Sequence, residues 1–223
     1  MGKEKGVLEK ILDGYVRSLI LRYPNLGIVR ESIVNAYLML EDCYEKGGKL
    51  LIAGNGGSAA DSEHIVGELM KGFKLSRELC DEFKAKLVRV DAELGPVLAG
   101  KLQGALPAIA LDGHLALTTA YMNDADPVLC FAQQVYGYGN NGDVLLGIST
   151  SGNSKNILYA ATVAKAKGMK VIGLTGAKDS KLSSIADIVV KVPQRETYMV
   201  QELHLPIYHC WCLMLESKFF GDV

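Results

Sequence analysis

The chain has 223 residues, which is enough for one α/β domain with a substantial core and short for two ordinary domains. Its 24 basic and 25 acidic residues give a formal net charge of -1, so the composition does not favour nucleic acid as a partner. Hydrophobic residues make up 49% of the sequence, but charges interrupt each apolar run before it is long enough to cross a bilayer. A membrane partner is therefore not expected either.

Two further features predict a cytoplasmic protein. The start, Met1 to Lys5, is charged, and the short apolar stretch from Val16 to Leu21 is too interrupted for a signal peptide. The cysteines are odd in number and have apolar or helical surroundings, which is typical of reduced thiols rather than of a disulfide framework. They are Cys43, Cys80, Cys130, Cys210 and Cys212.

The chain opens with two segments in which apolar residues recur at three- and four-residue spacing, 6–23 and 28–46. Pro24, Asn25 and Gly27 separate them. This pattern predicts two amphipathic helices within residues 1–48.

Five short apolar runs then alternate with helical segments, and they do not alternate polar with apolar residues. Such runs are typical of parallel strands that helices cover on both faces. The sequence therefore predicts a single α/β domain over residues 1–223, with a doubly wound, five-stranded parallel sheet in a core at 49–198. The expected strands are 49–53, 107–111, 143–149, 170–175 and 187–192.

Two other segments complete the prediction. Residues 71–105 form a charge-rich, mostly helical insertion after the first strand and its helix, interrupted by Gly95 and Pro96. A closing helix is expected from about Met199 to Phe220, within 199–223, and Pro206 should kink or restart it.

Two Gly/Ser-rich loops, 54–58 and 149–154, follow the first and third predicted strands. At the carboxyl ends of parallel strands, loops lead into helices whose first N–H groups are unpaired, and this is where anions bind. Hydroxyls and glycines in these loops suit a phosphorylated sugar, with phosphate held without a Walker-type lysine. Each loop alone is also compatible with a plain strand-to-helix turn. Dinucleotide binding is a rival for 54–59, but it lacks an acidic residue at the tip of the second strand.

A polar cluster is predicted on the flanking helices. His64 and Glu68 are four residues apart and share a helix face, a spacing that allows one metal ion to bind both. Gln201 and His209 lie on the closing helix. A solvated surface pair with a core histidine is the alternative. Asp61 is either a charge in the first helical turn or an acceptor for a histidine.

The segments 54–58, 61–69 and 142–154, together with Gln201 to His204 and His209, resemble the sugar isomerase (SIS) domain, and in particular the phosphoheptose isomerases. The resemblance covers nearly the whole chain except 71–105. It implies an isomerase of sedoheptulose 7-phosphate, bound zinc, and a homotetramer in which the two N-terminal helices form a central bundle and neighbouring subunits complete each site.

The resemblance also assigns residues. It implies zinc ligands at His64, Glu68, Gln201 and His209. It implies a phosphate grip at Ser149, Thr150, Ser151 and Ser154, and a sugar site lined by Asn55, Gly56, Gly57, Ser58, Asn123, Asp124 and Gln201. From position alone, Asp124 is equally suited to capping the helix expected at Pro127.

Aldose–ketose isomerisation moves a proton between neighbouring carbons through an enediolate, so it needs a base and an acid. Glu68 is the expected base and His209 the expected acid. A carboxylate bound to zinc is a poorer base, and the sequence leaves open whether Glu68 is base, ligand or both. A non-catalytic SIS protein of the replication-initiator-binding type, or an isomerase of another sugar phosphate, is the alternative.

Overall fold

The computed structural model describes residues 13–221. Its centre is a five-stranded sheet, ordered β2-β1-β3-β4-β5, in which every neighbouring pair is parallel. The predicted fold class is confirmed, and each strand lies within or close to its predicted range. The strands are β1 (Leu50–Ala53), β2 (Ala108–Ala110), β3 (Val144–Ile148), β4 (Lys170–Thr175) and β5 (Ile188–Lys191).

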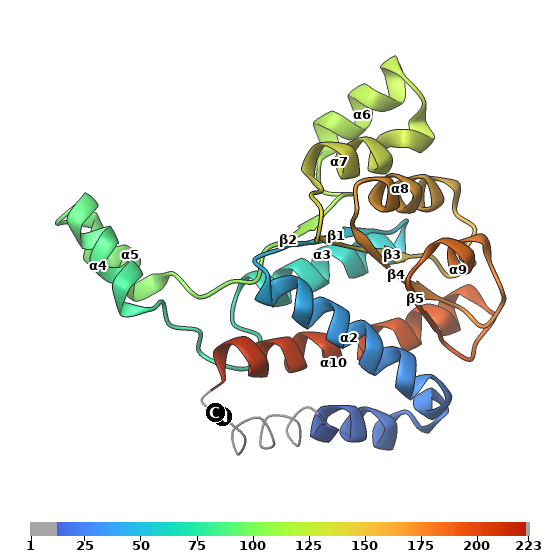
Figure 1. The fold of residues 1–223 in the computed structure, drawn as a ribbon, viewed down its shortest axis with the longest axis horizontal. Coiled ribbons are helices and arrows are strands. Elements are labelled where there is room, and N and C mark those ends of the chain that lie inside the picture. Colours follow the sequence, from blue (N-terminus) through green and yellow to red (C-terminus); the bar gives the residue numbers. More distant parts are fainter. Residues whose placement is uncertain (1–12, 222–223) are drawn as a thin grey trace.

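Helices cover both faces of the sheet, as Figure 1 shows. On one face, α2 (Arg30–Glu45), α3 (Gly57–Met70) and α10 (Thr197–Phe220) pack on side chains such as Ile52 and Leu146. On the other face, α7 (Cys130–Tyr138) and α8 (Lys155–Ala166) pack on the alternate residues, such as Leu51 and Leu145. Because every residue of β1 and β3 is buried, these strands carry apolar side chains on both faces.

The strand order reverses between β1 and β3. From β1 the chain crosses to β2 on one side, and it then returns to add β3, β4 and β5 on the other side. In open parallel sheets, ligands bind beyond the carboxyl ends of the strands at such a switch point. The two Gly/Ser-rich loops follow β1 and β3 and therefore lie at this position.

The insertion forms a helical arm, α4 (Asp81–Val90) and α5 (Leu94–Lys101), which projects away from the sheet in Figure 1. The break between its helices lies at residues 91–93, not at Gly95 and Pro96 as predicted. Asp91 accepts hydrogen bonds from the backbone N–H groups of Glu93 and Leu94 and so starts α5. Pro96 then falls in the first turn of α5, where its missing N–H costs nothing.

Of the two outcomes predicted for Pro206, a kink or a restart of the closing helix, the restart is wrong. α10 is assigned as one helix of 24 residues that runs through Pro206. Proline removes one backbone hydrogen bond, but Pro206 and Ile207 are buried, and packing holds both halves of the helix in place.

At the N-terminus, residues 13–22 are helical, and the earlier part of the predicted helix 6–23 lies outside the described residues. A 3₁₀ turn, η1 (Pro24–Val29), then leads into α2. The remaining elements are α6 (Leu115–Asp124), η2 (Pro127–Leu129) and α9 (Lys181–Ile185).

Within residues 13–221, no helix is both long and apolar enough to span a membrane. All five cysteines are free thiols, as predicted.

Candidate active site

The first loop turns sharply because of its glycines. A Cβ on Gly54 would collide with the backbone carbonyl of Ser58, and Gly56 has a φ of 57°, which favours glycine. This turn starts α3 directly after β1. Ser58 itself is buried within the first turn of the helix. The loop therefore presents backbone and Asn55 to solvent, while Ser58 faces the interior.

The second loop is built around an internal hydroxyl pair. Ser149 Oγ and Ser154 Oγ are 3.0 Å apart, and Ser149 is buried. Ser151 is exposed, and its Oγ accepts a hydrogen bond from the backbone N–H of Asn153 at 3.2 Å. Gly152, with a φ of 63°, packs against Ser180, so a side chain there would clash. The loop thus combines inward and outward hydroxyls at the start of α8.

The two loops are joined by a reciprocal amide pair. Asn55 Nδ2 donates to Asn156 Oδ1 at 3.0 Å, and Asn156 Nδ2 donates to Asn55 Oδ1 at 2.8 Å. Asn156 lies on the first turn of α8 and was not singled out from the sequence. In this structure the amide of Asn55 therefore holds the loops together.

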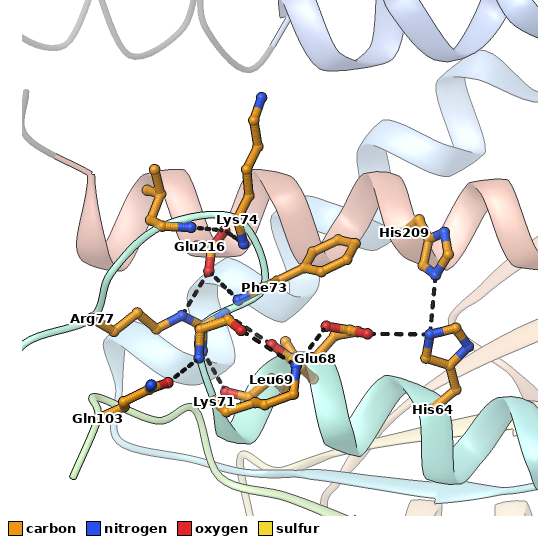
Figure 2. Close-up of polar contacts among 12 residues, drawn as sticks. His64, Glu68, Leu69, Lys71, Phe73, Lys74, Arg77, Gln103, His209 and Glu216 are labelled. Atoms are coloured by element: carbon orange, nitrogen blue, oxygen red, sulfur yellow. Dashed lines mark hydrogen bonds and ion pairs between the residues drawn. The ribbon is translucent and has the colours of Figure 1, made fainter. Parts of the chain in front are cut away.

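Three predicted catalytic or metal-binding side chains meet between α3 and α10. His64 Nε2 lies 3.2 Å from Glu68 Oε1 and 3.4 Å from His209 Nε2 (Figure 2). Lys71 Nζ lies 3.4 Å from the other oxygen, Glu68 Oε2. The cluster is open to solvent on the His64 side, whose side chain is 41% exposed, while the Glu68 side chain is 13% exposed. His64 and Glu68 thus form the i, i+4 pair that both interpretations expect, and His209 contacts that pair from α10.

Tyr208 and Asp61 support His64 from behind. The Tyr208 hydroxyl donates to Asp61 Oδ1 at 3.0 Å and lies 3.1 Å from His64 Nδ1. Its oxygen is thus left to accept a hydrogen bond from Nδ1–H of His64, which turns the lone pair of Nε2 towards Glu68 and His209. Asp61 is therefore an acceptor that reaches the histidine through a tyrosine, which the sequence did not indicate.

Burial also shifts the pKa values of the side chains around His64. It raises the pKa of Asp61 above its ordinary value, against the opposing effect of the Tyr208 hydrogen bond. Burial, together with the neighbouring Asp61, raises the pKa of Tyr208, which stays protonated. The pKa of His209 is lowered by burial and by the nearby His64.

The spacing of the donors can be compared with that of a zinc site. For bonds of about 2.0–2.1 Å to zinc, the donors of a tetrahedral site are about 3.3 Å apart, close to the 3.2 and 3.4 Å that separate His64 Nε2 from Glu68 and His209. The three donors are of the kinds that zinc binds in proteins. Among residues 13–221, however, no group of three or more His, Cys, Asp or Glu side chains is arranged so that it could hold a metal ion. Zinc at this position therefore stays a prediction.

Gln201, the fourth expected ligand, lies against the start of α3. A Cβ on Gly57 would come within 2.6 Å of Gln201 Nε2, so a larger residue at position 57 would require the amide to move. Among the described residues, no hydrogen bond links Gln201 to the three donors at His64. The structure therefore places Gln201 beside the first loop.

Asn123 and Asp124 end α6, and Asn123 Nδ2 donates to Asp124 Oδ1 at 2.8 Å. Both are exposed, and no hydrogen bond within residues 13–221 links either to the two loops. Their place in the sugar site stays a prediction. Asp126, not Asp124, caps η2, by accepting a hydrogen bond from the Val128 N–H at 2.9 Å.

Two cations that the sequence reasoning missed lie beside the second loop. A cavity of about 230 Å³ is lined by Thr150, Ser151 and Asn153, and by Lys178 and Arg195. Lys178 follows β4, and Arg195 follows β5, so both lie beyond the carboxyl ends of strands, as the loops do. Their position directly after parallel strands was the sequence signal that could have identified them. The loop itself contains no basic residue, but the fold supplies two from neighbouring loops.

The sequence matches a known family model and several curated proteins. A family model described as the SIS domain matches residues 90–176. A phosphoheptose isomerase of Thermodesulfovibrio yellowstonii is 39% identical over 216 residues, covering 95% of this chain and 92% of the relative. One of Burkholderia pseudomallei is 39% identical over 176 residues, covering 79% and 76%. The chain belongs to the phosphoheptose isomerase family.

Solved structures agree with this assignment. A phosphoheptose isomerase from Francisella tularensis has a TM-score of 0.73 at 33% identity, and one from Neisseria gonorrhoeae has a TM-score of 0.70 at 30% identity. In both cases 95% of this chain and 99% of the solved chain are covered. The chain is therefore an enzyme of the phosphosugar isomerase class, and the predicted family is confirmed.

Proposed function

We propose that the enzyme converts sedoheptulose 7-phosphate to D-glycero-D-manno-heptose 7-phosphate through an enediolate. The observation that carries the proposal is the meeting of Glu68 and His209 at His64, between two helices that flank the switch point of the sheet. The names of the relatives support the heptose phosphate as substrate.

The phosphate is bound by the second loop, through Ser149, Thr150, Ser151 and Ser154. Lys178 and Arg195 line the cavity beside these hydroxyls and add the positive charge that a phosphate dianion needs. The first loop borders the sugar through Asn55, Gly56 and Gly57, with Gln201 at its edge. The side chain of Ser58 faces the interior and does not line this site. Asn123 and Asp124 complete the sugar site.

Glu68 and His209 then divide the proton transfers. The carboxylate of Glu68 takes a proton from C1 of the ketose while His209 gives a proton to the oxygen on C2, which yields the enediol. Glu68 returns its proton to C2, and the hydroxyl proton on C1 returns to His209, which leaves an aldehyde at C1. The proton count is unchanged over the cycle.

Zinc is the proposed cofactor, held by His64, Glu68 and His209, with Gln201 as the fourth ligand after it moves from Gly57. When bound, it polarises the carbonyl oxygen and stabilises negative charge there. Tyr208 and Asp61 hold His64 with its Nε2 lone pair directed at the shared position.

A homotetramer is the proposed assembly. Large apolar side chains of the N-terminal helical region are exposed, namely Leu21 at 82%, Ile28 at 78% and Leu38 at 51%. These side chains need a cover, and neighbouring copies of the same region supply one.

Substrate identity is tested with a panel of ketose phosphates of five, six and seven carbons. Metal-stripped and zinc-restored enzyme is incubated with each in deuterium oxide, and exchange of the C1 and C2 protons is followed by NMR. The proposal predicts exchange and aldose formation with sedoheptulose 7-phosphate at the highest rate. Faster turnover of a shorter ketose phosphate would reassign the substrate.

A further inference from the structure

The helices that carry the two catalytic residues are joined by a buried ion pair. Arg77 Nε donates to Glu216 Oε1 at 2.9 Å, and both side chains are at most 1% exposed (Figure 2). Arg77 lies just beyond α3, at the base of the helical arm, and Glu216 lies on α10. A pair so completely desolvated survives only if further hydrogen bonds satisfy both groups.

The terminal nitrogens of Arg77 bind the C-terminal end of α3. They donate to the backbone carbonyls of Glu68, at 2.8 Å, and Leu69, at 2.7 Å. The last four carbonyls of a helix have no partner within that helix, and α3 ends at Met70. The guanidinium therefore grips the backbone of Glu68 itself.

Glu216 binds the chain that leaves α3. Oε1 accepts from the backbone N–H of Phe73 at 2.7 Å, and Oε2 accepts from those of Lys74 and Leu75 at 2.8 and 3.1 Å. With Arg77, this makes four hydrogen bonds to one carboxylate. The turn after α3 is thereby fastened to α10.

The pair is in register with His209. Glu216 follows His209 by seven residues, which in an α-helix is close to two full turns and about 10.5 Å along the axis. Both therefore point from nearly the same side of α10 towards α3. The Arg77–Glu216 pair and the contact of His209 with His64 therefore belong to the same interface between α3 and α10.

We infer that Arg77 and Glu216 are positioning residues for the isomerisation, which set the spacing of α3 and α10 and hence that of Glu68 and His209. Neither side chain contacts the cluster itself. The inference rests on the proposed roles of Glu68 and His209. It predicts that loss of the pair lowers kcat, while KM, which reflects binding at the loops, changes little.

A second buried carboxylate provides a matched control. Asp143 is 2% exposed and accepts from Lys49 Nζ at 2.6 Å and from the backbone N–H groups of Lys49 and Asn140. It lies just before β3, at the opposite edge of the sheet from the loops. Asp143→Asn and Glu216→Gln thus remove comparable buried charges, but only Glu216 joins α3 to α10.

The experiment compares Glu216→Gln, Arg77→Lys and Asp143→Asn with the unchanged enzyme, well below each unfolding midpoint. Arg77→Lys keeps the charge but not the fork that reaches two carbonyls. We expect a tenfold or greater loss of kcat in the first two variants, with KM within twofold. Asp143→Asn should retain kcat within twofold.

Imidazole ¹⁵N signals of His64 and His209 are recorded in the same proteins, because they report the geometry of the cluster whatever the substrate. They should shift in Glu216→Gln and Arg77→Lys and not in Asp143→Asn. If the unchanged enzyme does not act on any ketose phosphate, the proposed function fails, and these signals still decide the positioning role. Unshifted signals in both pair variants, or equal shifts in Asp143→Asn, would overturn the inference.

Discussion

Asn55 and Asn156 exchange two amide hydrogen bonds, at 3.0 and 2.8 Å, across the gap between the two Gly/Ser-rich loops. One residue comes from the loop after β1 and the other from the helix after β3, the two strands that meet at the switch point of the sheet. The first loop is therefore fastened to the start of the helix that follows the second loop.

Replacing Asn156 with Ala should weaken substrate binding. Each net hydrogen bond contributes about 1 kcal/mol, so loss of the pair should raise KM by about fivefold to thirtyfold, with kcat nearly unchanged. Steady-state kinetics measure this, with Thr162→Ala on α8 as the control, since the Thr162 hydroxyl bonds only to the Leu158 carbonyl. A drop in kcat with constant KM would show that the pair serves the chemistry instead.

Replacing Arg195 with Gln should also act on binding. Arg195 lines the cavity that Thr150 and Ser151 share, and removal of its charge should raise KM about tenfold and weaken competition by inorganic phosphate to the same degree. Lys155→Gln is the control, because Lys155 begins α8 but does not line that cavity. Equal effects of both substitutions would indicate a general electrostatic attraction rather than a contact.

His204 should make the fold sensitive to acid. It is completely buried, and burial lowers its pKa to about 4, against the opposing effect of the Thr175 backbone. Among residues 13–221, no hydrogen bond of good geometry reaches either ring nitrogen. The unfolded chain takes up this proton near pH 6.5, while the folded protein does so only near pH 4. Stability is therefore complete above pH 6.5 and is lost as the pH falls towards 4, by about 3 kcal/mol.

Urea denaturation of the unchanged enzyme and of His204→Met between pH 4 and pH 7 tests this. The two curves of unfolding free energy against pH should diverge below pH 6.5. Parallel curves over the whole interval would mean that the proton on His204 does not limit stability.

Replacing Leu38 with Glu should disrupt the proposed tetramer. A charge on an apolar side chain that is 51% exposed in the single chain costs nothing in a monomer and several kcal/mol in a dry interface. Light scattering after size exclusion should show smaller species for Leu38→Glu and the unchanged assembly for Leu38→Met. A monomeric unchanged enzyme would remove the proposal.

The sheet and the spacing of His64 and Glu68 were predictable because they depend on local pattern. Continuous apolar runs mark buried parallel strands, and residues four apart share a helix face. His209 was a candidate from the sequence alone, but only the family resemblance assigned it to one site with His64, because its distance from His64 depends on how α10 packs on α3.

The remaining site residues depend on tertiary structure. Tyr208 and Asn156 are close in sequence to predicted site residues, but their partners His64 and Asn55 come from distant elements. Arg195 reaches the second loop only because β5 lies in the same parallel sheet. The predicted restart of the helix at Pro206 does not occur, because the burial of α10 outweighs one lost hydrogen bond.

Solvent exchange at C1 shows whether Glu68 moves the proton between C1 and C2. Sedoheptulose 7-phosphate in deuterium oxide is followed by proton NMR with the unchanged enzyme, Glu68→Gln and Glu63→Gln, whose side chain is exposed on the same helix. We expect exchange at C1 with the unchanged enzyme and Glu63→Gln, and a loss of at least a thousandfold with a folded Glu68→Gln. Exchange at an undiminished rate in Glu68→Gln would contradict this role for Glu68.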